Sequence, residues 1–552
     1  MRVVVLGAGY AGLTVARALE RSLPEEVELV VVNDSPDHLV QHELHRLIRH
    51  PDLAEAITVP LSTVLSRVTV HEGTVTAVDT EQRALTYETE DGETSLEYDF
   101  AAICLGAVTD FYGLDQIEEH AITLKSITDA TRIRKAALDA TDGHAVVGGA
   151  GLSGIQVAGE LAELSTENEL NLDVTLVEMA DQIAPEFDAT MAAAIRRELE
   201  SRGVSIETGV GIEAADNGAV YLEGDETLPA DLFVWTGGIR GPDALDGTRP
   251  RPEPDLRVSD HTFVVGDAGD IVDANGRDVP ATAQAATQQA QVVAANIQRL
   301  VEDTDEFSEE GDRISIPVED ADGDEDPERP GAFEESGIDQ YELDLAGWVV
   351  SVGDGAVAMV GPFVFSGEPA KATKAAIVGQ HLGSVGAIQQ ASTLVAEELG
   401  WPTTDVFGIA AHLDATDQES IPLQPGSAAG KMTDVARIAA GLSETLTMGE
   451  TIDLTPFTRQ ADRNYPNSPV HTAQRLVTDS VGMVFGDCAS SDDDETTKID
   501  VEDSESEDEA GRADEAEKGD EAEMDDETES GDEAGRANEA ETNDDAETDD
   551  NV

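Results

Sequence analysis

Two glycine-rich segments have the spacing that nucleotide chemistry requires. In each, three glycines follow a short apolar run in the pattern GxGxxG, at Gly7, Gly9 and Gly12 and again at Gly149, Gly151 and Gly154. Such glycines permit a tight turn, a close backbone approach to a pyrophosphate and close packing of a helix on a strand. A helix that begins at the loop directs its positive end at the phosphates. The sequence therefore predicts two dinucleotide sites.

The residues around each loop predict the elements that hold it. Before the loops we expect strands over Val3–Leu6 and Ala145–Gly148, and after them helices over Leu13–Leu19 and Ile155–Leu164. A second strand is expected after each helix, over Val27–Val32 and Val174–Val177. A single GxGxxG motif is a weak signal, because glycine turns recur by chance. Two such motifs, each between a strand and a helix, indicate an α/β fold with two Rossmann-like domains.

The residue that ends each second strand indicates how a ribose is held. Glu178 has this position after the second motif, where a carboxylate suits a ribose 2′-hydroxyl and repels a 2′-phosphate, so NADH is favoured over NADPH. After the first motif Asn33 occupies the usual acidic position, so either Asp34 substitutes for it or the contact is weaker. Two dinucleotide sites indicate a bound redox cofactor and an exchanging one, with hydride transfer between them.

Five segments, in this order, resemble the flavoprotein family that has two dinucleotide-binding domains. They are GAGYAG, ICLGA, GGAGLSG, VWTGGIR and FVVGDAGD. The resemblance implies that the first motif binds FAD, that the second binds NAD(P)H, and that the NAD domain is inserted in the FAD domain. It also implies cofactor contacts from Asp267 to the flavin ribityl and phosphate region, from the Val75 backbone to adenine, and from Gly106 and Gly238.

One further segment, PATAQAATQQAQVVAANI, resembles the AQxAxQ segment of type II NADH dehydrogenases, which are NADH:quinone oxidoreductases. The resemblance implies that Gln284, Ala285 and Gln288 lie against the flavin and help to shape a quinone site. Gln156 replaces a glutamate that is frequent in the family, whereas Glu160 keeps a carboxylate for catalysis. The alternatives are an NADH-dependent reductase for a soluble acceptor, such as a ferredoxin, and a redox-regulated binding protein without turnover.

The cysteines and histidines argue against other chemistry. Cys104 and Cys488 form no CxxC or CxxxxC pair, which disfavours the disulfide-reductase and sulfide:quinone branches, and Cys104 is expected to be a buried apolar residue. Four histidines have partly helical spacing, at His38, His42, His45 and His50. No cysteine or acidic ligand pattern accompanies them, so we predict no metal and place them on a helix surface or facing the cofactor.

The charge indicates the solvent rather than the reaction. The 552 residues include 116 Asp and Glu against 33 Lys and Arg, a formal net charge of −83. This excludes a nucleic-acid binder, which needs a basic face, and attraction to anionic lipid through a polybasic patch. Only seven of the basic residues are lysines. Acidic, lysine-poor chains resemble proteins of extreme halophiles, in whose molar salt the Debye length falls to about 3 Å.

The sequence also predicts the order of domains. We expect the FAD domain over 1–115 and 246–300, the NADH domain over 116–245, an acidic insertion over 301–340, a C-terminal α/β region over 341–490 and a disordered acidic tail over 491–552. No signal-peptide layout or run of 18 apolar residues occurs, so a cytoplasmic protein is expected. The resemblance to type II NADH dehydrogenases implies a place in the respiratory chain. Peripheral attachment to the membrane and a homodimer stay open.

Overall fold

The structure is a computed structural model that describes residues 1–309, 338–345, 347–361 and 363–400. All of these belong to one compact unit, Met1–Ala489. The expected acidic tail, most of the acidic insertion and the second half of the C-terminal region lie outside the described residues.

The first domain is built on a six-stranded sheet with the order β19-β20-β9-β1-β2-β5. These strands are β1 (Arg2–Leu6), β2 (Glu28–Asn33), β5 (Thr69–Glu72), β9 (Phe100–Ile103), β19 (Arg257–Ser259) and β20 (Thr262–Val264). All neighbours in the sheet are parallel except β19 and β20. Because side chains alternate along a strand, Val3 and Val5 pack into one core cluster and Val4 and Leu6 into another.

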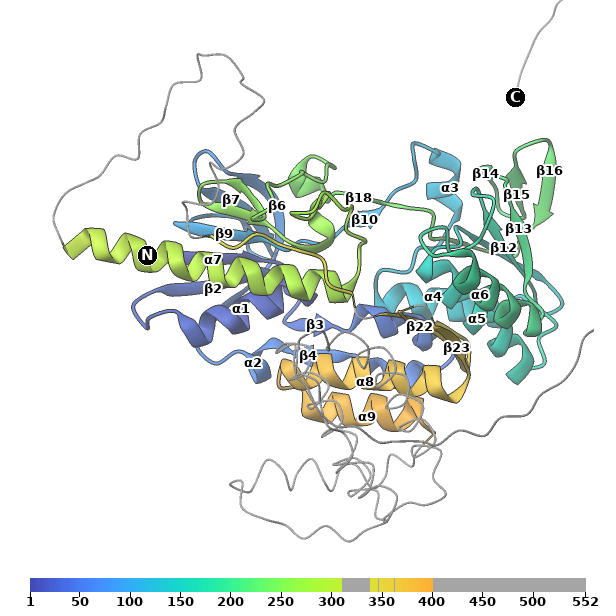
Figure 1. Cartoon of the computed structure of the whole chain (residues 1–552). Helices are drawn as coiled ribbons and strands as arrows, with labels where there is room; N and C mark the ends of the chain where they lie inside the picture. The colour runs from blue at the N-terminus through green and yellow to red at the C-terminus, as the bar shows by residue number, and fades with distance from the viewer. Residues whose placement is uncertain (310–337, 346, 362, 401–552) are drawn as a thin grey trace, which may run out of the picture. The chain divides into compact units, whose positions relative to one another are not determined.

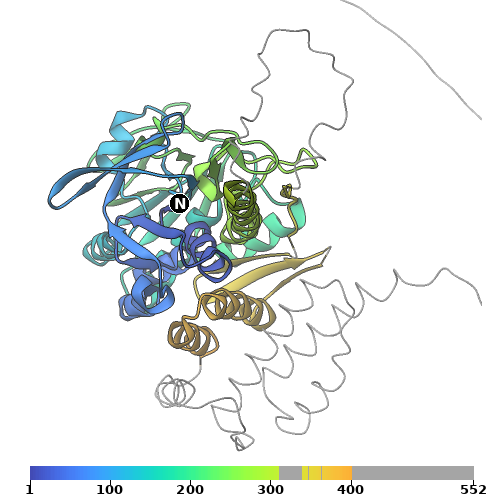
Figure 2. The same cartoon turned by 90° about the vertical axis from the view of Figure 1, so that its left-hand side faces the viewer.

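Each face of the first sheet has its own cover. Helices α1 (Tyr10–Ser22) and α7 (Ala283–Glu309) lie side by side on one face (Figure 1; Figure 2). On the other face is an antiparallel sheet of β6 (Thr74–Asp79), β7 (Ala84–Thr89) and β8 (Gly92–Glu97). Its buried Leu85 and Tyr87 share a cluster with Val4 and Leu6. The helix α7 continues past residue 300, so the expected acidic insertion begins inside a helix.

Between β2 and β5 the chain forms short elements. They are β3 (Asp37–Leu39), the 3-10 helices η1 (Gln41–Ile48) and η2 (Pro51–Glu55), β4 (Thr58–Pro60) and α2 (Leu61–Val64). The strands β3 and β4 pair antiparallel. Most of η1 is buried, because it packs against α4 and α5 of the second domain.

The second domain has a parallel sheet with the order β13-β12-β11-β17. Its strands are β11 (His144–Gly148), β12 (Asp173–Glu178), β13 (Ser205–Thr208) and β17 (Leu232–Trp235), and its helices are α3 (Asp115–His120), α4 (Ile127–Asp139), α5 (Leu152–Glu167) and α6 (Ala189–Ser201). A smaller antiparallel sheet joins β14 (Ile212–Ala215), β15 (Ala219–Leu222) and β16 (Glu226–Pro229). The domain lies in sequence between β9 and β20, so the expected insertion of one Rossmann-like domain in another is confirmed.

The two connections between the domains pair with each other, since β10 (Val108–Thr109) is antiparallel to β18 (Ile239–Arg240). Two short 3-10 helices follow, η3 (Asp243–Leu245) and η4 (Gly266–Ala268). The C-terminal region contains β21 (Gly347–Val352), β22 (Gly355–Val360), β23 (Phe363–Ser366), α8 (Glu368–Ser384) and α9 (Ile388–Glu398), drawn in yellow to orange in Figure 1. In it β21 packs on α5, and β22 packs on α6 and α8. No described helix is long and apolar enough to cross a membrane.

The glycine loops allow a direct test of the fold. A Cβ added at Gly154 would lie 1.8 Å from the Gly149 carbonyl oxygen, whereas a Cβ added at Gly151 meets nothing within 4 Å. We expect Gly154→Ala to lower the free energy of unfolding by about 3 kcal/mol or more, because the added methyl group overpacks the contact. The control Gly151→Ala is expected to cost less than about 1 kcal/mol. Urea unfolding in high salt measures both, and equal losses would contradict the close helix–strand approach.

Candidate dinucleotide-binding sites

The first glycine loop joins β1 to α1 and leaves space for an anion. Gly7 has φ +91°, a backbone conformation that favours glycine. A Cβ on Gly12 would lie 1.8 Å from the Gly7 carbonyl oxygen, so the helix can approach the strand only with glycine there. Gly9 is the N-cap of α1, and an added Cβ would meet nothing within 4 Å. The free amides of this helix end therefore suit a pyrophosphate.

The second loop repeats this geometry in the second domain. Gly149 has φ +93°, Gly151 is the N-cap of α5, and Gly154 lies as close to the loop carbonyl as Gly12 does. Both predicted motifs thus form the cradle that a dinucleotide needs.

The residue at the end of the second strand fixes each loop in the same way. The Glu178 carboxylate accepts hydrogen bonds from the backbone N–H groups of Ala150, at 2.6 Å, and Ala180, at 2.8 Å. In the first domain the Asn33 side-chain oxygen accepts from the Ala8 N–H at 2.7 Å. Asn33 therefore makes the loop contact that Glu178 makes through a carboxylate, while the adjacent Asp34 is exposed.

Asp267 follows β20 and lies in η4, beside two cations that the sequence did not single out. Burial raises the pKa of Asp267, and the positive charges of Lys125 and Arg249 oppose that rise. Burial lowers the pKa of Lys125, and Asp267 opposes this shift. The Arg249 Nε donates to the Asp267 carbonyl at 2.8 Å. The rarity of lysine is the one sequence signal for Lys125, which is among only seven lysines of the chain.

The three residues predicted at the start of α7 have three different environments. Ala285 is buried, Gln284 is exposed, and Gln288 donates to the backbone carbonyl of Asp344 while accepting from its N–H at 3.3 Å. The buried glutamine is Gln289, which accepts from the Gly266 N–H at 2.6 Å and so supports the turn before Asp267. Its i, i+4 spacing from Ala285 is a helical signal that identifies the buried face.

The remaining predicted cofactor contacts lie at backbone positions. Gly106 follows β9 with φ +66° and has open space where a side chain would be, and Val75 is buried on β6. At Gly238 the constraint is steric and not a positive φ. A Cβ there would lie 2.1 Å from the Tyr112 hydroxyl, which donates to the Gly237 carbonyl at 3.1 Å.

Glu160 lies on α5, away from the loop at its start, and is only 1% exposed. Burial raises the pKa of its carboxyl group, and the charges of Arg49, Lys374 and Arg46 oppose this. Arg49 Nε donates to the carboxylate at 2.9 Å. Removing one partner of such a buried pair costs about 3–5 kcal/mol. The structure therefore brings Glu160 into a buried ion network, which sequence spacing does not reveal.

The expected helix-surface placement is wrong for two of the histidines, and the cofactor-facing placement stays a prediction for them. His38 lies on β3 and His45 on η1, and both are buried rather than on a helix surface. The His38 Nδ1 donates to the Ala8 carbonyl at 2.8 Å, and burial lowers the pKa of its ring to about 4. His42 Nδ1 accepts from the Tyr10 hydroxyl. Among the described residues no group of three or more His, Cys, Asp or Glu side chains is placed to hold a metal.

Cys104 directly follows β9 and is buried, as expected, and burial raises the pKa of its thiol. A buried thiol with a raised pKa is a poor nucleophile. The cysteine therefore serves packing against the first loop, where an added Cβ on Gly7 would lie 2.5 Å from the Cys104 carbonyl oxygen.

Two nested Rossmann-like domains with matched phosphate cradles define the class of two-dinucleotide-fold oxidoreductases. The model of the family named pyridine nucleotide-disulphide oxidoreductase matches residues 1–290, and the chain belongs to this family. A type II NADH:quinone oxidoreductase of Staphylococcus aureus (strain NCTC 8325 / PS 47) is 28% identical over 343 residues, which cover 55% of this chain and 84% of that protein.

Solved structures share the fold. NDH2 from Plasmodium falciparum, in complex with NADH, matches with a TM-score of 0.59 and 13% identity over 72% of this chain and 97% of that one. The sulfide:quinone oxidoreductase of Aquifex aeolicus matches with a TM-score of 0.53 and 16% identity over 77% and 99%.

Proposed function

We propose that the protein is an FAD-dependent NADH dehydrogenase that passes electrons to a quinone. The observation that carries this proposal is the pair of matched glycine cradles, one in each nested domain, of which the second is bounded by Glu178. When bound, FAD accepts a hydride from NADH and passes two electrons to the acceptor. The chain's own residues bind and orient the two nucleotides, and the likeness to the S. aureus NADH:quinone oxidoreductase supports the same reaction.

The first cradle and the Asp267 turn would hold FAD. The N-terminus of α1 supplies backbone N–H groups for the pyrophosphate, with Asn33 holding the loop. Asp267 lies where the carboxyl end of β20 reaches the same edge of the sheet, and Gln289 fixes the turn before it. Lys125 and Arg249 partly neutralise this carboxylate, so an anionic cofactor meets less repulsion there.

The second cradle would hold NADH. Two backbone N–H groups fix the Glu178 carboxylate at the end of β12, beside the second glycine loop. A fixed carboxylate accepts a hydrogen bond from a ribose 2′-hydroxyl and repels the 2′-phosphate of NADPH. The proposal needs no side-chain nucleophile, which agrees with the burial of Cys104.

Gln284 is the best candidate for contact with the acceptor. Its side chain is exposed at the start of α7, whereas Gln288 is bonded to the Asp344 backbone and Gln289 supports η4. An uncharged amide hydrogen-bonds a quinone carbonyl without placing a charge beside it. Glu160, which was predicted to be catalytic, is proposed to act through its ion pairs with buried cations such as Arg49 and not by direct contact with the cofactor. Peripheral attachment to the cytoplasmic face of the membrane and a place in the respiratory chain belong to the same proposal.

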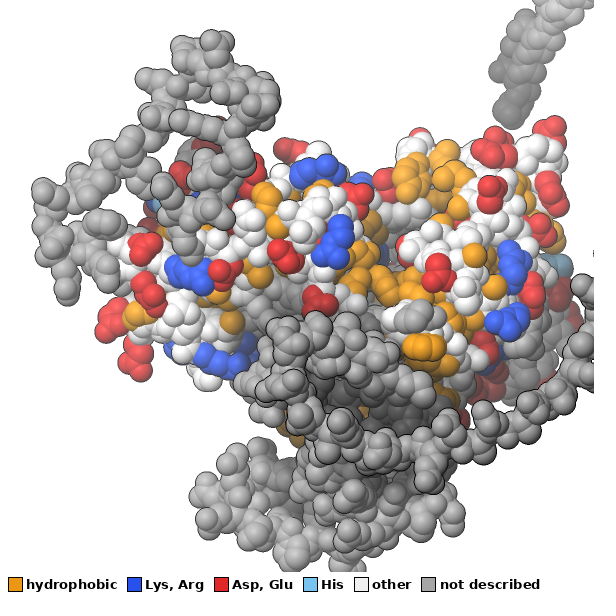
Figure 3. Space-filling view, viewed as in Figure 1, with side chains coloured by type: hydrophobic (Ala, Val, Ile, Leu, Met, Phe, Trp, Pro, Cys, Tyr) orange, Lys and Arg blue, Asp and Glu red, His pale blue; other side chains and the backbone are white. Residues whose placement is uncertain are grey.

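The surface supports a halophilic origin as a further part of the proposal. Acidic side chains are scattered over the visible face and outnumber the lysine and arginine side chains among them (Figure 3). Such a surface repels itself at low ionic strength and is screened in molar salt. Backbone amides at helix ends remain able to bind anionic nucleotides under these conditions.

The first test concerns the hydride donor. Protein purified in molar KCl is expected to show flavin absorbance that bleaches with NADH and much less with NADPH. Glu178→Ala removes the repulsion of a 2′-phosphate, so the ratio of kcat/KM for NADH to that for NADPH should fall at least about tenfold. Stopped-flow absorbance in anaerobic buffer measures both. A correctly folded protein without flavin, or with flavin that NADH leaves oxidised, would refute the proposal.

The second test concerns the acceptor. Gln284→Ala is expected to lower turnover with a soluble quinone analogue about tenfold or more, because the amide contact is lost, while flavin reduction by NADH stays unchanged. Gln291→Ala, which removes another exposed glutamine of α7, is the control. Equal quinone turnover in both variants argues against a quinone site at Gln284. Rapid turnover with a ferredoxin and none with quinone would favour the soluble acceptor.

The third test concerns salt. Dilution from about 3 M to about 0.2 M KCl lengthens the Debye length and restores repulsion between acidic side chains. We expect flavin release and loss of NADH-dependent bleaching on dilution, measured by flavin fluorescence in the filtrate of an ultrafiltration cell. Full flavin retention at low salt would contradict the halophilic assignment but not the enzyme class.

A further inference from the structure

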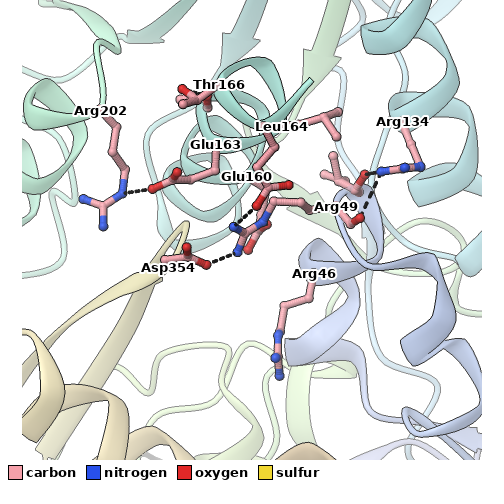
Figure 4. Close-up of polar contacts among 12 residues, drawn as sticks. Arg46, Arg49, Arg134, Glu160, Glu163, Leu164, Thr166, Arg202 and Asp354 are labelled. Carbon is pink, nitrogen blue, oxygen red and sulfur yellow. Dashed lines mark hydrogen bonds and ion pairs between the residues drawn. The ribbon is translucent and has the colours of Figure 1, made fainter. Parts of the chain in front are cut away.

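Arg49 joins three parts of the molecule at a single guanidinium group. It is the C-cap residue of η1 in the first domain, and its side chain is 5% exposed. Its Nε donates to Glu160 and one NH group to Glu167, both on α5 of the second domain and both at 2.9 Å. Its other NH group donates to Asp354, in the turn between β21 and β22. Figure 4 shows Arg49 between Glu160 and Asp354.

The backbone at this point is held as well. Arg134 of α4 donates from one NH group to the carbonyls of Ile48, at 2.8 Å, and Arg49, at 3.0 Å (Figure 4). These carbonyls end η1 and would otherwise lack partners within the helix. The second domain therefore holds η1 from two helices, by side chain through α5 and by backbone through α4.

Loss of the ion pair between Arg49 and Glu160 would leave a buried carboxylate without this partner, which is energetically unfavourable. Glu160 is 1% exposed, and burial raises the pKa of its carboxyl group while the nearby cations oppose that shift. Screening by salt is weak for buried pairs, so molar salt leaves this contact in place. Glu167 and Asp354 are exposed, so salt screens their attraction to Arg49 far more strongly. Glu160 is therefore the partner that fixes the position of Arg49.

The helix α5 carries this contact to the nucleotide site. It begins at the Gly151 cap, and Glu160 and Glu167 lie farther along the same continuous helix. A helix moves as a rigid rod, so its hold on η1 also sets where its N-terminus lies relative to the first domain. Hydride transfer requires the two rings within about 3–3.5 Å, and an error of about 1 Å costs up to about 100-fold in rate.

We propose that Arg49 is a positioning residue that sets the orientation of the NADH-binding domain relative to the FAD-binding domain through α5. The proposal rests on the proposed function for the identity of the two nucleotides. The orientation itself follows from contacts among the protein's own residues.

The matched control is Arg202, which also pairs with a glutamate of α5. Its Nε donates to Glu163 at 2.9 Å (Figure 4). One of its NH groups donates to Glu198 of α6 at 2.8 Å, and both glutamates belong to the second domain. Arg202, the C-cap residue of α6, makes no contact to η1, so Arg202→Gln removes an arginine partner of the α5 residue Glu163 and leaves the contacts of η1 in place. Arg49→Gln removes the contact to η1, and Arg49→Lys keeps a charge for Glu160 but cannot reach three carboxylates in fork geometry.

The first readout is a distance in the ligand-free protein. Spin labels are placed on cysteines substituted for the exposed Glu26 and Glu207, one in each domain, in a Cys488→Ser background with Cys104 buried. Double electron–electron resonance should give a narrow distribution in the parent and in Arg202→Gln. In Arg49→Gln the distribution should broaden or shift by several ångströms, and in Arg49→Lys it should lie between these. An unchanged distribution in Arg49→Gln would overturn the proposal.

The second readout separates positioning from loss of structure. Stopped-flow reduction of the flavin by saturating NADH should slow about 10- to 100-fold in Arg49→Gln, with flavin content and reoxidation by quinone nearly unchanged. Equal losses in flavin content and in both half-reactions would show a merely structural role and overturn the proposal. If the parent itself is not reduced by NADH, the proposed function fails, while the distance measurement still decides the role of Arg49.

Discussion

The close approach of a helix to the end of a strand, at two places, is the constraint on which the rest of the structure depends. A Cβ at Gly12 or Gly154 would lie 1.8 Å from a loop carbonyl oxygen, so each approach exists only with glycine there. The approach places free N–H groups at the start of α1 and α5, at the edge where parallel strands end. Ligands of open α/β sheets bind at this edge. Glycine spacing therefore determines both the packing of each domain and the position of its nucleotide site.

This constraint also explains how a chain of formal charge −83 can suit two anionic nucleotides. The cradles use backbone amides, whose contribution does not require a basic surface. Cations are instead placed where a carboxylate must be buried. Lys125 and Arg249 lie beside Asp267, and Lys374 and Arg46 contribute around Glu160. These four basic residues thus offset the charge of buried acids, while other arginines, such as Arg240 and Arg251, pair with exposed acids.

The sequence predicted the parts of the fold that depend on local spacing. The strands and helices around both glycine motifs were predicted to within a few residues, because apolar runs and GxGxxG turns are local signals. The sequence marked Asn33 as a candidate ribose contact, but its hydrogen bond from the Ala8 N–H was not predicted. The network of Arg49 could not be predicted, since its partners Glu160 and Asp354 are 111 and 305 positions away. Gln288 shows the same limit, because its partner is a backbone group 56 positions away that no side-chain pattern reveals.

Local sequence spacing and contacts between distant residues therefore describe different requirements of one reaction. Glycine spacing creates two competent nucleotide sites, but each could form in a separate protein, and neither determines where the other lies. The relative placement depends on contacts between domains, and in the described residues the second domain holds η1 through Arg134 at the backbone and through Glu160 at the Arg49 side chain. A buried ion pair is a weak source of stability, because desolvation offsets most of its attraction. Its geometry is nevertheless strict, since a carboxylate buried as deeply as Glu160 tolerates few alternative positions. The same pair that adds little to folding is thus well suited to hold two domains at one angle.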